Sequence, residues 1–353
     1  MTLVIPTMLY LFYFIVAMTA KSNPVNTLSE LPYISIIIPA HNEESSIGER
    51  IDNLAEVYPV DKMEIIVSND GSTDRTEAVA WEALGKYNRG VDWRVITYER
   101  QGVNVAINRG INSSSYGIIV ITGADGLFDK NTIPHLVSVL LSSKDIGAVS
   151  GDLIPIAKGE SIFSQSEKAY RSIYGKICTW ESNLHSTFCF NGPVVAIRKH
   201  VISSLNPRKG ADDASMALSI IRNGYKCKYV PTAKFYEYVP NKFMKQQNQK
   251  IRRATRLLEA TFSNIDLLSP KCGKFGVIIF PLRILMFAVV PFMIFIGLIL
   301  NPFLLATVIL FMIFPPWNRV ISPFFIYNFY LLVGLFNMVR DVHIWEHTER
   351  VEI

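Results

Sequence analysis

Two similar segments near the start of the chain constrain its fold most. They are Ile34-Ser-Ile-Ile-Ile-Pro-Ala-His-Asn-Glu-Glu-Ser45 and Ile65-Ile-Val-Ser-Asn-Asp-Gly-Ser-Thr-Asp-Arg-Thr76. Each begins as an apolar run without alternation, which is typical of a strand covered on both faces. Each then passes through a polar turn into a sequence that predicts a helix. Two consecutive strand–turn–helix units predict a parallel sheet with both turns at the carboxyl ends of the strands, where ligands of such sheets bind.

Apolar residues are concentrated at the two ends of the 353-residue chain. Residues 3–20 form one nearly uncharged block, and residues 275–339 form another, interrupted by Arg283, Arg319 and several prolines. This distribution predicts a membrane-attached protein with one soluble domain of about 240 residues. We expect an anchor at residues 1–21, the domain at residues 32–260, transmembrane or interfacial helices at residues 274–340, and a tail at residues 341–353.

The first apolar block predicts a retained anchor, because it lacks a basic n-region and Met18-Thr-Ala-Lys21 is a poor cleavage site. Lys21 is the only charge near this block, and the positive-inside rule then places the domain in the cytoplasm. The C-terminal block has a middle apolar stretch, residues 303–316, that is short for a span of about 20 residues. We therefore expect a multi-pass protein of the cell membrane, with the number of C-terminal spans left open.

The charge and the cysteines exclude several classes of protein. The net charge is +5, and much of it lies in residues 242–256 and 271–274, where aromatic residues do not interleave in a nucleic-acid-binding pattern. We expect these segments to face anionic lipid headgroups and not a nucleic acid. Cysteines 178, 189, 227 and 272 show neither CxxC spacing nor a nearby histidine cluster, which predicts no zinc site and no disulfide framework. No Gly-x-Gly-x-x-Gly follows the first strand, so a Rossmann dehydrogenase is not indicated.

Four further motifs follow in order. Gln101-Gly-Val-Asn-Val-Ala-Ile-Asn-Arg-Gly110 predicts a helix, and Gly117-Ile-Ile-Val-Ile-Thr-Gly-Ala-Asp-Gly126 predicts a buried strand with an acid at its end. Gly210-Ala-Asp-Asp-Ala-Ser-Met-Ala-Leu218 places two acids at the start of a helix, and Gln249-Lys-Ile-Arg-Arg253 is strongly basic. Taken alone, the paired acids would be read as helix capping favoured by the helix dipole.

Together, over residues 33–255, these motifs resemble those of the membrane-bound family 2 glycosyltransferases, related to lipid-linked sugar transferases and polysaccharide synthases. The resemblance implies an α/β GT-A domain, with a mostly parallel sheet flanked by helices, joined to transmembrane helices. It implies that the nucleotide-sugar, with a weak preference for UDP, contacts the two turns and the following helix. The residues that match these positions are Pro39, Ala40, Asn42, Glu43, Asp70 and Asn108.

The resemblance also implies a metal site and a catalytic base. Asp125 matches the second acid of the family's Asp-x-Asp site for Mg²⁺ or Mn²⁺, whereas Gly123 replaces the first. Asp213 matches the base that takes a proton from the acceptor hydroxyl, and Asp212 stands in the preceding Glu position. One base without a protein nucleophile implies a single displacement with inversion. Val103 stands where the family usually carries lysine.

Two further matches concern the acceptor side and the donor diphosphate. Asn191 and Gly192 lie in a turn that resembles the one beneath the acceptor sugar. Gln249 and Arg252 match the Gln-x-x-Arg-Trp motif of processive synthases, whose glutamine and arginine reach the donor diphosphate, and Arg253 replaces its tryptophan. Because tryptophan stacks on a growing polymer and arginine binds phosphate, this difference favours a single transfer.

The sequence therefore predicts an inverting glycosyltransferase of the hexosyl- or N-acetylhexosaminyltransferase class. It would move a sugar to a lipid or lipid-linked glycan at the cytoplasmic membrane face. A processive polysaccharide synthase is the alternative, and a catalytically weak binding or assembly subunit is a second one. The tail segment Ile344-Trp-Glu-His-Thr-Glu-Arg350 resembles a family ending and favours a cytoplasmic tail. The oligomeric state, the sugar and the acceptor's identity stay open.

Overall fold

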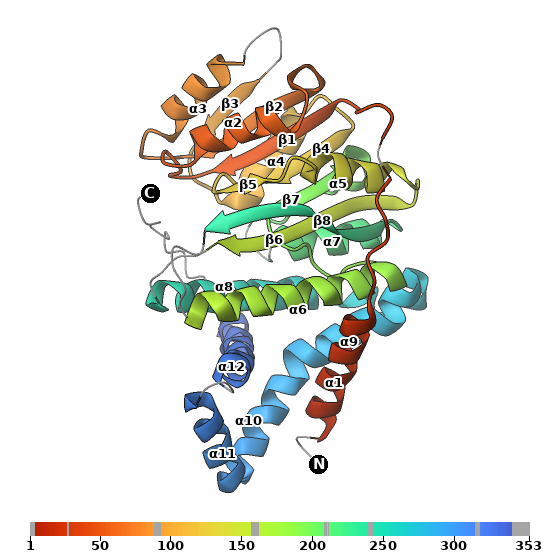
Figure 1. Cartoon of the computed structure of the whole chain (residues 1–353), viewed down its shortest axis with the longest axis vertical. Helices are drawn as coiled ribbons and strands as arrows, with labels where there is room; N and C mark the ends of the chain where they lie inside the picture. Colours follow the sequence, from red (N-terminus) through yellow and green to blue (C-terminus); the bar gives the residue numbers. More distant parts are fainter. Residues whose placement is uncertain are drawn as a thin grey trace.

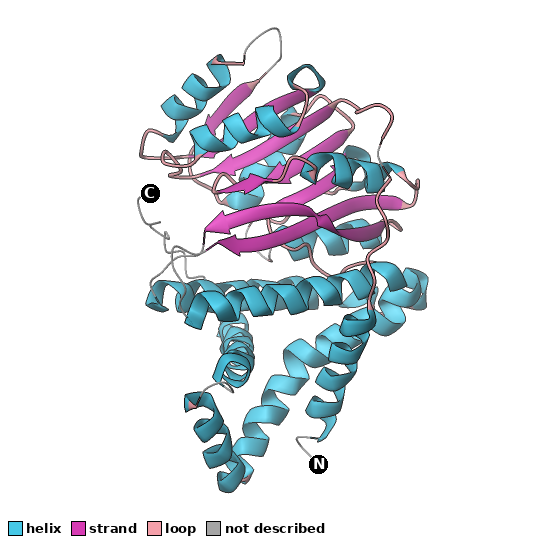
Figure 2. Ribbon diagram, viewed as in Figure 1, coloured by secondary structure: helices cyan, strands magenta, loops and turns pink. Residues whose placement is uncertain are grey.

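The computed structural model describes residues 4–26, 28–87, 93–156, 162–207, 210, 212–238, 243–314 and 318–340. The predicted tail at residues 341–353 lies outside this part of the chain. In Figures 1 and 2 a twisted sheet lies at one end, two long helices cross beneath it, and the N- and C-terminal apolar helices extend away on the other side.

The described sheet has eight strands in the order β3-β2-β1-β4-β7-β6-β8-β5. Strands β1, β2, β3 and β4 pair in parallel, and so do β6 and β8, whereas β7 and β5 pair with antiparallel neighbours. The sheet is therefore mixed, with four parallel and three antiparallel pairings among the described strands. Its strands are β1 (Ile34–Ala40), β2 (Met63–Asp70), β3 (Arg94–Tyr98), β4 (Ile118–Thr122), β5 (Gly126–Phe128), β6 (Ile146–Ile156), β7 (Val194–Arg198) and β8 (Lys226–Tyr238).

Helices cover both faces of the sheet, as the unbroken apolar sequences of β1 and β2 predict. Because side chains alternate along a strand, Ile36 and Ile38 of β1 pack into one core and Ile37 packs into the other. The first core includes α2 (Ile47–Val57), α3 (Thr76–Gly85) and α5 (Thr132–Leu141); the second includes α4 (Val103–Ser113) and α7 (Asp212–Arg222). Short 3-10 helices complete the domain: η1 (Val60–Lys62), η2 (Lys199–Val201), η3 (Ile265–Leu267) and η4 (Pro270–Cys272).

The two long helices beneath the sheet are α6 (Ile162–Leu184) and α8 (Phe243–Phe262), and they separate the sheet from the apolar helices (Figure 1). The apolar helices are α1 (Val4–Thr19), the continuous segment Phe275–Leu300, α11 (Pro302–Ile313) and α12 (Asn318–Arg340). Within the described residues, only Phe275–Leu300 is both long and apolar enough to cross a bilayer. Phe303 on α11 is 84% exposed, so an apolar surface is left uncovered there.

The segment Phe275–Leu300 is not a uniform α-helix. It contains π-helical turns at η5 (Phe275–Ile279) and η6 (Leu285–Val289), which alternate with α9 (Phe280–Ile284) and α10 (Val290–Leu300). Each π turn is followed within two residues by a proline, Pro281 or Pro291, which has no N–H to donate to the helix. The π-helical turns therefore accommodate the two prolines, and the helix continues through both positions.

A buried ion pair attaches this segment to the domain. Arg283 Nε donates to Glu181 Oε1 of α6 at 2.6 Å, and the two side chains are only 3% and 0% exposed. The other oxygen of Glu181 accepts the Phe188 backbone N–H at 3.0 Å. The carboxylate thus joins α6, the segment before β7 and the apolar segment Phe275–Leu300 in one contact.

We expect Glu181→Gln to lower the free energy of unfolding by about 3–5 kcal/mol, because it leaves Arg283 buried without its counter-charge. The amide oxygen can still accept the Phe188 N–H, so the loss reports the ion pair. Combining it with Arg283→Met should recover most of the lost stability. Denaturant unfolding of the detergent-solubilised chain measures both; a double variant as unstable as the sum of the single variants would contradict the assignment.

Candidate active site

The turns after β1 and β2 are held together by direct hydrogen bonds. Asn42, which has the left-handed φ of 55°, accepts the Thr73 N–H on its Oδ1 at 2.8 Å and donates its own N–H to Ser72 Oγ at 3.0 Å. The Glu43 N–H donates to Thr76 Oγ1 at 2.7 Å. The two motifs predicted to meet at the sheet edge therefore form a single bonded unit.

Asp70 at the end of β2 fixes the start of α4. Its carboxylate oxygens accept the backbone N–H groups of Gln101 at 2.7 Å and Gly102 at 2.8 Å. Gly71 follows with φ 64°, and a Cβ there would lie 2.7 Å from the Arg100 nitrogen. The sequence predicted that Asp70 binds the nucleotide. In the structure its carboxylate also supports the loop that precedes α4.

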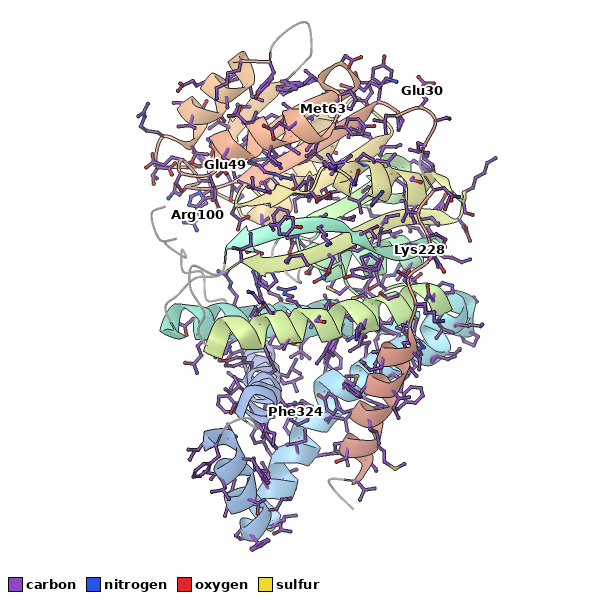
Figure 3. The ribbon with its side chains drawn as sticks, viewed as in Figure 1. Glu30, Glu49, Met63, Arg100, Lys228 and Phe324 are labelled. Carbon is purple, nitrogen blue, oxygen red and sulfur yellow. The ribbon has the colours of Figure 1, made fainter. Side chains whose placement is uncertain are left out.

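One cavity of about 1610 Å³ connects this edge of the sheet to the apolar helices. Its wall runs from Arg100 beside the sheet to Phe324 on α12, and Figure 3 labels both residues. Eleven of the predicted site residues line it: Pro39, Ala40, Asn42, Glu43, Asp70, Asp125, Gly192, Asp212, Asp213, Arg252 and Arg253. The structure therefore brings the predicted nucleotide, metal and base positions into one continuous space.

Asp125 occupies part of the volume that a first acid of an Asp-x-Asp pair would need. A Cβ on Gly123 would lie 2.6 Å from Asp125 Oδ1 and 3.3 Å from Pro193 Cγ. Because Gly123 has no side chain, the Asp125 carboxylate can lie against the backbone at position 123. The sequence identified the substitution but could not give this reason for it.

Arg50 lies buried near this carboxylate, and the sequence gave no sign of its role. Its guanidinium donates to Thr122 Oγ1 at 2.6 Å and to Asn53 Oδ1 at 2.8 Å, and it stacks 3.9 Å from the centre of the Phe128 ring. Burial lowers the pKa of Arg50 to about 9, and the charge of Asp125 opposes this shift. Arg50 thus supplies positive charge close to the predicted metal position.

Asp213 stands at the first turn of α7, on the cavity wall. Burial and the charge of Asp212 raise the pKa of Asp213 to about 6, whereas the Ala214 N–H, the Cys189 thiol and Arg253 oppose the rise. The Ala214 N–H lies 2.7 Å from Asp213 Oδ1. A carboxylate with this pKa is a stronger proton acceptor than an ordinary aspartate and is still ionised at neutral pH.

Two predicted contacts lie away from the cavity wall. The Asn108 amide exchanges hydrogen bonds with the Leu205 backbone, both at 2.8 Å, and so fastens α4 to the segment after β7. Asn191 is fully buried; its oxygen accepts from Arg171 and its nitrogen donates to Asp152, again both at 2.8 Å. These amides hold the scaffold, whereas Gly192, with φ 82°, reaches the cavity.

A second polar cluster joins α6, α8 and α12, and sequence reasoning missed it. Glu167 accepts from Lys250 Nζ at 2.5 Å, Tyr327 Oη at 3.0 Å and Arg171 Nε at 3.3 Å. Burial opposes ionisation, but Lys250 and Arg171 lower the pKa of Glu167 to about 2. Of the predicted basic motif, Arg252 and Arg253 reach the cavity, and the side chain of Gln249 lies outside the described part.

Asp125 can supply one ligand to a divalent metal ion whose remaining ligands come from the bound diphosphate and water. Among the described residues, no group of three or more His, Cys, Asp and Glu side chains is placed to hold an ion unaided. Mg²⁺ and Mn²⁺ accept one protein carboxylate together with phosphate oxygens and water. A divalent ion at Asp125 would therefore depend on the bound diphosphate.

Comparisons with known proteins agree on the type of domain. Residues 35–202 match the model of a family described as Glycosyl transferase family 2. A probable glycosyltransferase of Bacillus subtilis is 28% identical over 64% of this chain and 56% of its own length. A poly-β-1,6-N-acetyl-D-glucosamine synthase of Staphylococcus aureus is 25% identical over 78% of this chain and 66% of its own length. The chain thus spans less than two thirds of these relatives.

A solved structure resembles the described fold over nearly its whole length. It is a mannosyltransferase from Pyrobaculum calidifontis in complex with GDP-mannose and Mn²⁺, with a TM-score of 0.79 and 22% identity. The match covers 97% of this chain and 98% of that one. At this identity the likeness establishes a shared fold, which includes the apolar helices as well as the sheet domain.

We expect Gly123→Ala to weaken Mn²⁺-dependent nucleotide binding about tenfold, because the added methyl group displaces the Asp125 carboxylate. Gly117→Ala is the matched control, since a Cβ at Gly117 meets nothing within 4 Å. Calorimetric titration with UDP and with GDP, with and without Mn²⁺, measures the effect. Equal metal dependence in the two variants would show that Asp125 is not the ligand.

Proposed function

Because residues 35–202 form a family 2 glycosyltransferase domain, we propose that this chain is an inverting glycosyltransferase at the cytoplasmic face of a membrane. It would transfer a sugar from a nucleotide-sugar, UDP-linked by preference, to a lipid or a lipid-linked glycan. The observation that carries this proposal is the single cavity that holds Asp70, Asp125 and Asp213 and continues to α12. A water-soluble donor and a membrane-held acceptor could enter it from opposite ends.

In this proposal the two turns bind the nucleoside. Pro39, Ala40, Asn42 and Glu43 line the cavity at that end, and Asp70 keeps the start of α4 in place beside them. Asp125 would hold Mg²⁺ or Mn²⁺, which neutralises negative charge on a departing diphosphate. The Mn²⁺ and GDP-mannose bound by the Pyrobaculum enzyme support a divalent ion and place GDP-sugars beside UDP-sugars as donors to test.

Asp213 acts as the general base on the acceptor. It takes the proton of the acceptor hydroxyl while that oxygen forms a bond to the anomeric carbon. The bond from the anomeric carbon to the diphosphate breaks, and the nucleoside diphosphate leaves with its electron pair. A single displacement inverts the anomeric centre. The raised pKa of Asp213 and its place on the cavity wall support this role.

The membrane attachment belongs to the same proposal. The domain would be residues 32–260, anchored by residues 1–21 and by the apolar helices within residues 274–340. The exposed apolar side chains of α1, Phe275–Leu300 and α11 support burial in lipid, among them Ile5, Met8, Leu300, Phe303 and Ile313. α1 and α11 are shorter than a full span, so tilted or partly inserted helices are included in the proposal.

A processive polysaccharide synthase is the second candidate, because the Staphylococcus aureus relative is named as one. Arg253 in place of the tryptophan platform favours a single transfer, and product length distinguishes the two. A binding or assembly subunit without catalysis is a third candidate. It would function unchanged without the carboxylate of Asp213.

Nucleotide release tests the proposal directly. Purified, detergent-solubilised chain is incubated with UDP- and GDP-sugars, Mg²⁺ or Mn²⁺, and a membrane lipid extract as acceptor. We expect release from one donor that depends on both the metal and the lipid, with one sugar added per acceptor. Long products would favour the synthase, and nucleotide binding without release from any donor would favour the assembly subunit.

We expect Asp213→Asn to reduce turnover by about 10²–10⁴-fold, because the amide cannot accept a proton. In the unaltered chain, kcat/KM should fall tenfold per pH unit below pH 6, where Asp213 becomes protonated, and stay level above it. The raised pKa means that ionised Asp213 destabilises the fold above pH 6, so Asp213→Asn should keep or raise Tm at pH 7.5. Asp145→Asn, at an exposed carboxylate outside the cavity, is the control; equal losses in both variants would refute the base.

A further inference from the structure

Three arginines of α8 line the cavity below Asp213: Arg252, Arg253 and Arg256. The spacing places Arg252 and Arg256 on one face of the helix, one turn apart, with Arg253 beside them. Burial and the charges of Arg256 and Arg253 lower the pKa of Arg252, so Arg252 lies near both of the other guanidinium groups. Guanidinium groups gathered on one cavity wall favour an anionic ligand there.

Arg253 connects the proposed base to the next cation along the cavity. It is near enough to Asp213 to oppose the rise in the pKa of that carboxyl, and near enough to Lys250 to help lower the pKa of the ammonium group. Lys250 is already bonded to Glu167. Arg253 therefore lies between the proposed site of reaction and the cluster around Glu167.

Beyond Lys250 the cavity wall becomes aromatic and apolar. Lys250 Nζ lies 4.6 Å from the centre of the Tyr327 ring, which stacks on Tyr170 at 4.5 Å. Tyr10 of α1 packs edge-on against Phe324 of α12 at 4.8 Å. We call this part of the cavity the aromatic end; its other walls include Phe14, Met286 and Leu331. Such walls accept a hydrocarbon chain.

Along the cavity, the carboxylate of Asp213 is followed by the arginines of α8 and then by the aromatic end. We propose that the acceptor is a phosphate-bearing lipid, with its reactive hydroxyl at Asp213, its phosphate or diphosphate at Arg253 and Arg256, and its hydrocarbon chain in the aromatic end. This inference rests on the proposed function and names its acceptor class. Guanidinium groups bind phosphate oxygens in pairs, which an indole at position 253 could not do.

Binding of a small mimic tests this without knowledge of the natural acceptor. The full chain in detergent is saturated with nucleoside diphosphate at a fixed free Mn²⁺ concentration, so that the donor position is filled. Farnesyl diphosphate, farnesol and inorganic diphosphate are then titrated, with the shift in Tm as readout. We expect farnesyl diphosphate to bind at least tenfold more tightly than either of the others. Equal binding by farnesol would overturn the role of the anion, and equal binding by inorganic diphosphate would overturn the role of the lipid.

Variants assign the contact to its residues. Arg256→Gln and Arg253→Trp should each weaken binding of farnesyl diphosphate at least tenfold, whereas Arg222→Gln, at a surface arginine paired with Asp266, should not. Unchanged affinity in both cavity variants would overturn the inference. Failure of the unaltered chain to bind any nucleotide would count against the proposed function itself. Nucleotide binding without preference for farnesyl diphosphate would count against the acceptor class alone.

Discussion

Buried charge that is paired across elements holds the two halves of this molecule in one arrangement. Glu181 binds Arg283, and Glu167 binds Lys250 and Tyr327, so α6 is joined both to the apolar segment Phe275–Leu300 and to α8 and α12. A misplaced partner would leave a charge buried without compensation, which is costly. These contacts disfavour other ways of packing the apolar helices against α6. The cavity between the sheet and the apolar helices therefore has a defined shape.

The same physics separates the tasks of the acids in the cavity. Asp70 accepts two backbone N–H groups and supports a loop, and Asp125 lies near a buried guanidinium. Asp213 combines burial with a like-charged neighbour, so its proton affinity rises. Three aspartates in one cavity therefore differ in chemistry because of what surrounds them. In the proposed mechanism, Asp213 can then accept a proton and Asp125 can bind a cation in the same cavity.

Much of the sheet domain could be predicted from the sequence, and the family resemblance is confirmed by the match over residues 35–202. Unbroken apolar runs predict buried strands, and β1 and β2 are present where those runs stand. The antiparallel pairing of β7 was not foreseen, because pairing direction depends on distant connections. Arg50, Glu167 and Lys250 were missed for the same reason: a lone charged residue carries no local sign of the partner it will meet. The roles of the site residues stay predictions.

The interlocked turns at Asn42 and Thr73 have a consequence for how the protein can change. Each turn owes its shape to a partner about thirty positions away, so neither is an independent module. A chimera that grafts only one turn from a relative would lose the Asn42–Thr73 and Glu43–Thr76 contacts and disturb both. Donor preference should therefore evolve, or be engineered, through paired exchanges of the two segments.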